Sequence, residues 1–299
     1  MPIADFGGQP TPSFDVWADI QQLLQFHFMQ NAFIAGTIVA ALAGLIGYFM
    51  VLRGQSFAGH TLSQVGFPGA AGAALVGVTP ALGLLVFCVG SALGIAALSD
   101  GRGRERRAET AAIGSILAFT LAVGFLFASL YGGFVEGVYA FLFGTFSGIS
   151  DSQVVMVAAV AAVAVAILIC IGRPLFFASV DAEVAAARGV PVRALAVAFL
   201  VLLGLAVAET AQITGTLLVF ALLVAPAATA QQLTARPGLG MMLSVVIALL
   251  VTWLGLAIAY FTVYPIGFFV TSLAFASYLG ARAVRWATRA SGRRAAALA

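Results

Sequence analysis

The stretch ALAVAFLVLLGLAVAETAQITGTLLVFALLVAPAATAQQL, residues Ala194–Leu233, decides the fold class of this chain. Its only charged side chain is Glu209. The stretch is long enough for two helices of about 20 apolar residues, the length that crosses a bilayer. We interpret it as two spans, Ala194–Ala211 and Thr214–Leu233, joined by a tight turn at Gln212–Gly215. Similar apolar runs fill the rest of the chain, which indicates an all-α, polytopic transmembrane helical bundle.

The composition excludes a soluble fold. Of the 299 residues, 62% are hydrophobic and 8% are charged, whereas soluble domains carry about 25% charged residues. The net charge of +3 comes from arginines in short loops. These arginines do not build the basic folded surface that a nucleic-acid-binding domain presents. We therefore expect the chain to lie in a lipid bilayer and to bind no nucleic acid.

The basic residues set the predicted orientation. All 14 are arginines, and pairs of apolar runs separate their clusters. Cytoplasmic loops of membrane proteins carry the excess of Lys and Arg. Every arginine faces the cytoplasm if the N-terminus lies outside and the C-terminus inside. The arginines are Arg53, Arg102, Arg104, Arg106, Arg107, Arg173, Arg188, Arg193, Arg236, Arg282, Arg285, Arg289, Arg293 and Arg294.

This orientation needs an odd number of spans, and we predict nine. Besides the two spans above, they are Phe28–Leu52, Leu62–Val78, Ala81–Leu98, Ala111–Tyr131, Ser152–Ile171, Leu239–Val263 and Ile266–Leu279. The half-apolar stretch Tyr139–Ile149 is too short to span, and we interpret it as a re-entrant or interfacial helix. The transmembrane domain covers residues 27–281, between an external segment, 1–26, and a cytoplasmic tail, 282–299.

Several kinds of chemistry are absent from the sequence. Without lysine there is no Walker A loop to hold ATP phosphates. There is no H-E-x-x-H, and His27 and His60 lie far apart, which disfavours an intramembrane zinc protease. The carboxylates Glu136, Asp151 and Glu209 fall near the outer ends of predicted spans, so no mid-span carboxylate points to an ion-coupled carrier. A stand-alone secondary transporter and an intramembrane enzyme remain as alternatives to a transporter driven by a partner.

The inner connection 173–193 contains a predicted short helix. Ser179 or Asp181 can cap its N-terminus, and Asp181 and Glu183 suit the positive end of the helix dipole. Gly189 supplies the left-handed residue that ends a helix. A free-standing cytoplasmic helix is either a docking element for a soluble partner or an interfacial connector.

A second constellation lies in RGQSFAGHTLSQVGFPGAAGA, residues Arg53–Ala73. His60 and Gln64 are four residues apart and share a face if the stretch is helical. Pro68 and Gly69 predict a loosened helix just beyond. Transporters build substrate sites at discontinuous helices, but a lone histidine near the membrane interface is also often structural.

The order of these pieces resembles the integral-membrane permease of bacterial zinc/manganese ABC importers. That family typically carries R-x-x-S-F-x-G-D-A-L-S-H-x-x-x-P-G, then D-x-E-x-A-x-x-x-G-V, then a span ending in L-L-V-x-P-A-A-T-A. The resemblance runs from about Met29 to Leu279. The matching residues are Arg53, Ser56, Phe57, Gly59, Leu62, Ser63, Pro68 and Gly69, then Asp181, Glu183, Ala185, Gly189 and Val190, then Leu222, Leu223, Val224 and Pro226–Ala230.

The resemblance implies a homodimeric permease in the bacterial cytoplasmic membrane, driven by two cytoplasmic ABC ATPase subunits. The chain itself would then not be an enzyme. The ATPase would dock on the second motif, at Asp181, Glu183, Ala185 and Gly189. No cofactor is expected to be bound permanently, because the divalent metal is cargo.

The resemblance also implies an extracytoplasmic metal-binding protein that docks on the acidic outer face, at Glu136, Asp151 and Glu209. Helix breaks along the pathway are expected at Pro68, Gly69 and Pro226.

In the first motif, His60 and Gln64 replace the Asp and His that the family carries on its metal path. The resemblance thus places both residues on the path of the metal. Imidazole favours zinc, whereas manganese prefers oxygen ligands. We therefore expect a divalent transition metal as cargo, with zinc first and manganese second.

Overall fold

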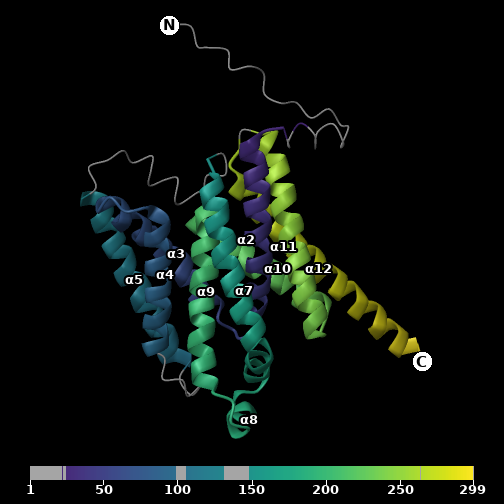
Figure 1. The fold of residues 1–299 in the computed structure, drawn as a ribbon. Coiled ribbons are helices and arrows are strands. Elements are labelled where there is room, and N and C mark those ends of the chain that lie inside the picture. The colour runs from purple at the N-terminus through teal and green to yellow at the C-terminus, as the bar shows by residue number, and fades with distance from the viewer. Residues whose placement is uncertain (1–21, 23–24, 99–105, 131–147, 263, 299) are drawn as a thin grey trace.

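In the computed structural model, the described residues form a bundle of α-helices. The structure describes residues 22, 25–98, 106–130, 148–262 and 264–298. Most of the N-terminal segment, Glu136 and nearly all of the stretch Tyr139–Ile149 lie outside these ranges. The described helices are α2 (His27–Leu52), α3 (Ser56–Leu75), α4 (Pro80–Leu98), α5 (Arg106–Leu130), α7 (Asp151–Val180), α8 (Ala182–Ala187), α9 (Val192–Thr214), α10 (Thr216–Leu233), α11 (Pro237–Tyr260) and α12 (Ile266–Leu298), as Figure 1 shows.

Each predicted span overlaps one long helix of the described part of the chain. Seven of these helices are long and apolar enough to cross a membrane. The other two are α3 and α10. Helix α3 carries His60, Gln64 and several glycines, and the apolar part of α10 is short, Leu218–Leu233. The prediction of an all-helical membrane bundle is confirmed. That the chain crosses the membrane nine times, and which side of the membrane each terminus faces, stay predictions.

Two helices extend further than the sequence predicted. Helix α7 passes through Pro174 and ends at Val180, not at Ile171. A proline inside a helix costs about 3 kcal/mol through a lost hydrogen bond and a clash. Leu175 and Ala178 are buried just beyond Pro174, and their packing holds the last turns in place. Helix α12 likewise continues to Leu298. The predicted inner connection 173–193 therefore shrinks to α8 and its short flanks.

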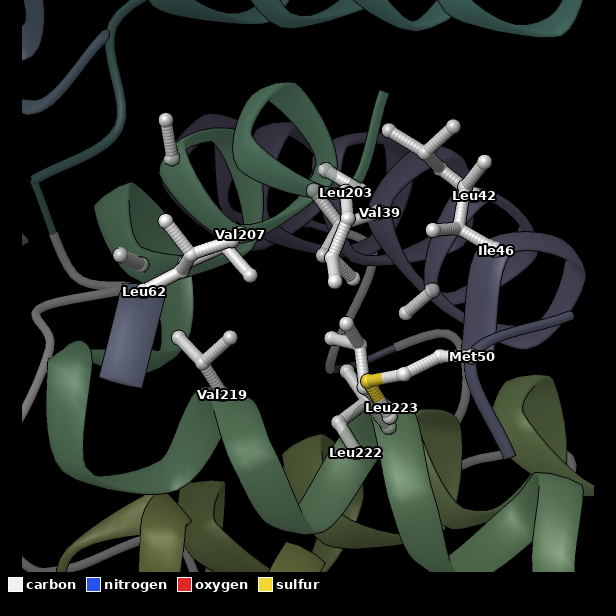
Figure 2. Packing of buried hydrophobic residues seen from close by; sticks show 14 of the residues in the cluster. Val39, Leu42, Ile46, Met50, Leu62, Leu203, Val207, Val219, Leu222 and Leu223 are labelled. Carbon is white, nitrogen blue, oxygen red and sulfur yellow. The ribbon is translucent and has the colours of Figure 1, made fainter. Parts of the chain in front are cut away.

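Helices α2 and α9 form the centre of the bundle, and they are the most buried of the seven candidate spans. Helix α2 packs against α7, α9, α10 and α11, while α3, α4 and α5 pack together on one flank and α10, α11 and α12 on the other (Figure 1). Figure 2 shows the centre from close by. Its labelled side chains, all at most 1% exposed, are Val39, Leu42, Ile46, Met50, Leu62, Leu203, Val207, Val219, Leu222 and Leu223.

Helices α3 and α4 approach each other closely where two glycines face one another. A Cβ atom on Gly83 would overlap the carbonyl oxygen of Gly69, and a Cβ on Gly69 would overlap that of Gly83. Small residues of this kind let transmembrane helices approach backbone to backbone. Helix α3 runs through Pro68 and Gly69 without interruption, and α10 runs through Pro226. The predicted helix breaks at these three residues are therefore absent, because neighbouring helices pack tightly around them.

We expect Gly83→Ala to destabilise the bundle, because the new methyl group would push α3 away from α4. Overpacking of this kind costs roughly 1–3 kcal/mol. It should lower the thermal unfolding temperature of the purified protein in detergent. Gly90→Ala on the same helix is the matched control, since a Cβ there meets nothing within 4 Å. Equal unfolding temperatures for the two variants would contradict the close contact between α3 and α4.

Candidate functional site

The short helix α8 is capped at its N-terminus by the predicted aspartate. Asp181 Oδ1 accepts a hydrogen bond from the backbone N–H of Val184 at 2.9 Å, which satisfies one of the free donors in the first turn. Ser179, the other candidate cap, lies in the last turn of α7, where its hydroxyl donates to the Leu175 carbonyl. Because α7 continues to Val180, the cap falls to Asp181 alone.

The C-terminus of α8 ends as predicted. Gly189 takes a φ of 80°. Its N–H bonds to the carbonyl of Ala186, and the N–H of Val190 bonds to the carbonyl of Ala185 at 3.0 Å. These two bonds form a Schellman motif. Ala185 is fully buried against the bundle, whereas Glu183 and the rest of α8 are exposed. Helix α8 therefore protrudes from one end of the bundle as a rigid element (Figure 1).

Hydrogen bonds gather several helix ends at the α8 end of the bundle. Arg53, just after α2, donates to the Ser179 hydroxyl at the end of α7 at 3.1 Å. Gln231, near the end of α10, donates to the Tyr48 carbonyl at 3.3 Å. Arg285 of α12 donates to Gln232 at 2.6 Å. These contacts place Arg53 and Arg285, from distant parts of the sequence, at the same end of the bundle.

His60 and Gln64 lie one turn apart on α3, as the spacing predicted, and both are half-buried. The His60 ring packs edge-on against the ring of Phe220 from α10, with 5.0 Å between ring centroids. Its Nδ1 atom is buried and has no hydrogen-bond partner among the described residues. An unsatisfied buried ring nitrogen is costly for a purely structural residue, and it is available as a ligand atom.

The face of α3 that carries His60 and Gln64 reaches the surface of the chain. Phe57, one turn before His60, is 42% exposed. Phe220 borders this face from α10. Sequence reasoning missed Phe220, because its position 160 residues further along the chain gives no local signal for the contact.

At the opposite end of the bundle, Asp151 joins α7 to α2. Its Oδ1 atom lies 2.9 Å from His27 Nε2 and accepts a hydrogen bond from Asn31 Nδ2 at 2.7 Å. The side chains of His27 and Asp151 are 72% and 73% exposed. Asp151 is therefore exposed at the end of the bundle opposite α8, and whether that end faces outward stays a prediction. Its two partners lie more than 100 residues away in sequence and were not predicted.

Glu209 departs from the prediction of an outer-face docking residue. It lies in the last turns of α9 and is 0% exposed. Neighbouring helices cover it, so it offers no surface to a soluble partner. The third predicted docking residue, Glu136, lies outside the described residues. Among the described residues, no three His, Cys, Asp or Glu side chains gather in a way that could hold a metal ion.

Comparison with known proteins identifies the family that the chain matches. The family model described as the ABC 3 transport family matches residues 25–285. The manganese import system permease protein ScaB of Streptococcus parasanguinis is 31% identical to the chain, over 81% of the chain and 85% of the relative. The manganese transport system membrane protein MntC of Halalkalibacterium halodurans is 30% identical, over 72% and 73%.

A solved structure has the same fold. The structure of PsaBC from Streptococcus pneumoniae in complex with Fab contains a chain that superimposes with a TM-score of 0.78 at 28% sequence identity. The alignment covers 89% of this chain and 95% of that one. The arrangement of the helices over the aligned part of the chain is therefore a shared architecture.

We expect Gly189→Val to loosen α8 without unfolding the bundle. A β-branched residue resists positive φ, and the left-handed conformation costs a non-glycine residue roughly 1–2 kcal/mol. Amide hydrogen exchange should become faster at the two N–H groups of the Schellman motif and unchanged in α9. Gly189→Asn is the control, because asparagine tolerates this conformation. If exchange in the valine variant equals that of the unmodified protein, the glycine cap is not what holds α8.

Proposed function

Since the chain belongs to the ABC 3 transport family, we propose that it is the permease through which an ATP-driven importer moves a divalent transition metal ion into a bacterial cell. The chain is a multi-pass membrane protein, and a separate subunit hydrolyses ATP. The absence of lysine fits this division, because a chain without lysine cannot form a Walker A loop. Family membership also argues against the stand-alone secondary carrier and the intramembrane enzyme.

The observation that carries the cargo proposal is the unpartnered Nδ1 atom of His60. Neutral imidazole is a common ligand of transition metals. Gln64, one turn further along α3, adds a carbonyl oxygen on the same face. Two protein donors give weak binding, and weak binding suits a path on which an ion must also be released.

We rank manganese ahead of zinc as the cargo. The relatives named above are both called manganese transport proteins. This reverses the order that the imidazole of His60 suggested by itself. The two metals remain chemically distinguishable at this site, because Mn²⁺ gains from oxygen donors and Zn²⁺ from the ring nitrogen.

A second copy of the chain completes the path in this proposal. The His60 and Gln64 face of α3 lies at the surface of one copy, next to exposed Phe57. Two copies that meet on this face would bring together two imidazoles and two amides. Most soluble homo-oligomers use such twofold contacts, and the same geometry applies to a pair of permease subunits.

Helix α8 is the proposed contact for the ATPase subunit. It is exposed, capped at both ends and placed at the arginine-rich end of the bundle. Glu183 and Arg188 offer charges on its surface, and Val184 adds an exposed apolar side chain. A helix that is capped at both ends can move as a unit when the ATPase subunit bound to it moves. The Gly189→Val variant should therefore also lose ATPase stimulation by cargo, and Gly189→Asn should keep it.

The outer end is the proposed docking face for an extracytoplasmic metal-binding protein. Asp151 and His27 are exposed there and already joined. Exposed pairs of this kind contribute little stability, so their charge is free to serve recognition. The proposal drops Glu209 from this face because it is buried.

We predict that the α8 end faces the cytoplasm and that the loop between α3 and α4 faces outward. The test uses single cysteines at two exposed positions, Val76→Cys and Ala186→Cys, in a Cys170→Ala background. An impermeant thiol reagent should label position 76 in intact cells and position 186 only after lysis. Labelling of position 186 in intact cells would reverse the topology. Cys88 is buried and should stay unlabelled.

We predict that His60→Ala reduces metal uptake at least tenfold while the complex still assembles. The measurement is uptake of radiolabelled Mn²⁺ and Zn²⁺ in a host that lacks its own transporters. His60→Asp combined with Gln64→His restores the family's usual pair and should recover uptake, with a shift toward Mn²⁺ because the pair keeps one imidazole and a charged carboxylate replaces the neutral amide.

Phe220→Leu separates the metal role of His60 from its packing role. This variant removes the ring contact of His60 and keeps the imidazole. It should transport at close to the unmodified rate. If Phe220→Leu fails as His60→Ala does, or if His60→Ala transports both metals normally, His60 is a packing residue and the path lies elsewhere.

A further inference from the structure

Glu209 is a carboxylate enclosed by the bundle with half of its hydrogen-bonding capacity unused. Its side chain is 0% exposed. The Oε1 atom accepts one hydrogen bond, from Gln212 Nε2 at 3.3 Å. The Oε2 atom is buried and has no hydrogen-bond partner among the described residues. A buried carboxylate is expected to be paired or to bind a cation, and neither the fold nor the proposed path through His60 uses this one.

A cavity of about 500 Å³ lies between the start of α4, the start of α7 and the end of α9, and Gln212, the hydrogen-bond partner of Glu209, lines it. Polar side chains line it together with apolar ones. The lining includes Thr79 and Leu84 from the α4 side, Ser152 and Gln153 from α7, and Gln212 from α9. Most of the lining is apolar, but the side chains of Thr79, Ser152, Gln153 and Gln212 give it a polar part, and a cavity of this size has room for a hydrated cation.

Glu209 does not line the cavity itself, but it shares a helix face with two residues that do. Gln212 and Ile213 both line the cavity, and they follow Glu209 by three and four residues on α9. Residues at these spacings share one helix face. Glu209 therefore points along the same face as the cavity, one turn deeper.

Gln212 separates the cavity from the carboxylate. Its amide nitrogen donates to Glu209 and, at 3.5 Å, to the Ala208 carbonyl. The positive edge of this NH₂ group lies against the carboxylate, where a cation would bind. Rotation of the Gln212 amide would remove the donor and turn its carbonyl oxygen toward the same point. The Gln212 side chain can thus first block access to the Glu209 carboxylate and then serve as a second ligand.

Helix ends of both signs meet at the cavity. Helix α9 ends here, so the negative end of its dipole faces the cavity. The positive ends of α4 and α7 also face it, and Asp151 in the first turn of α7 offsets one of them. Among the described residues that line the cavity there is no arginine.

We propose that Glu209 and Gln212 form a second cation site, which a divalent metal reaches through the cavity between α4, α7 and α9. The donors are a carboxylate and an amide oxygen, completed by water in the cavity. Such oxygen-rich sets suit Mn²⁺ better than Zn²⁺. This inference deepens the proposed metal transport, because it gives each permease subunit an internal site separate from the His60 face.

The test compares Glu209→Gln with the unmodified protein, as the purified complex with its ATPase. The amide keeps the size of the side chain and removes its charge. Free Mn²⁺ is followed by electron paramagnetic resonance during a titration with MnCl₂. The unmodified complex should bind one more Mn²⁺ per permease subunit than Glu209→Gln does. Thr210→Val is the matched control, because its hydroxyl bonds back to the Ala206 carbonyl within the same helix.

His60→Ala separates this inference from the proposed function. Loss of one Mn²⁺ in each single variant and of both in the double variant supports two sites. Loss in Glu209→Gln alone supports the internal site and contradicts the role of His60. Unchanged binding in Glu209→Gln, or no Mn²⁺ bound by the unmodified complex, overturns the internal site.

A second measurement tests the route and does not depend on the stability of the Glu209 variant. Ser152→Cys, in the Cys170→Ala background, places a thiol in the cavity lining. A bulky thiol reagent attached there should slow Mn²⁺ binding in the His60→Ala complex at least tenfold. The same reagent on Val76→Cys should leave the rate unchanged. Equal rates for both modified proteins would show that the metal does not enter through this cavity.

Discussion

A polar group inside a bilayer must find its partner within the protein, because lipid offers none. This bundle meets that constraint largely within single helices. Many buried hydroxyls return to their own backbone, as when Thr210 donates to the Ala206 carbonyl and Thr214 to the Thr210 carbonyl. Among the described residues, six buried side-chain atoms have no partner, and four of them are threonine hydroxyls. The other two, the ring nitrogen of His60 and the second oxygen of Glu209, are atoms of the kind that bind metal ions.

Close packing explains how the helices hold these groups. Glycines allow α3 to lie against α4 at Gly69 and Gly83. One side of α3 is thereby fixed in the bundle, and the opposite side keeps His60 at the surface of the chain. Helices α2 and α9 fill the centre with large apolar side chains (Figure 2). Glu209 lies on the outer part of α9, above this apolar centre and next to the cavity.

The two proposed ion sites differ in chemistry and in access. His60 offers a ring nitrogen on a face that a second copy could complete, whereas Glu209 offers a carboxylate behind the side chain of Gln212. An ion that met the carboxylate first would exchange part of its water shell for fixed oxygens near the outer end. At the opposite end, α8 is capped by Asp181 and Gly189 and, apart from buried Ala185, is exposed, as the proposed ATPase contact requires.

The sequence by itself determined the membrane-embedded helical class, the position of each long helix, the glycine at the C-terminus of α8 and the shared face of His60 and Gln64. These features depend on local composition, periodicity and backbone preference. Only the tertiary structure decided that α3 and α10 continue through Pro68 and Pro226, because neighbouring helices hold them. In the sequence, Glu209 lies near the end of a predicted span, and nothing there shows whether it is exposed. It is buried because α9 lies at the centre of the bundle. Contacts between helices far apart in the chain leave no pattern in a single sequence.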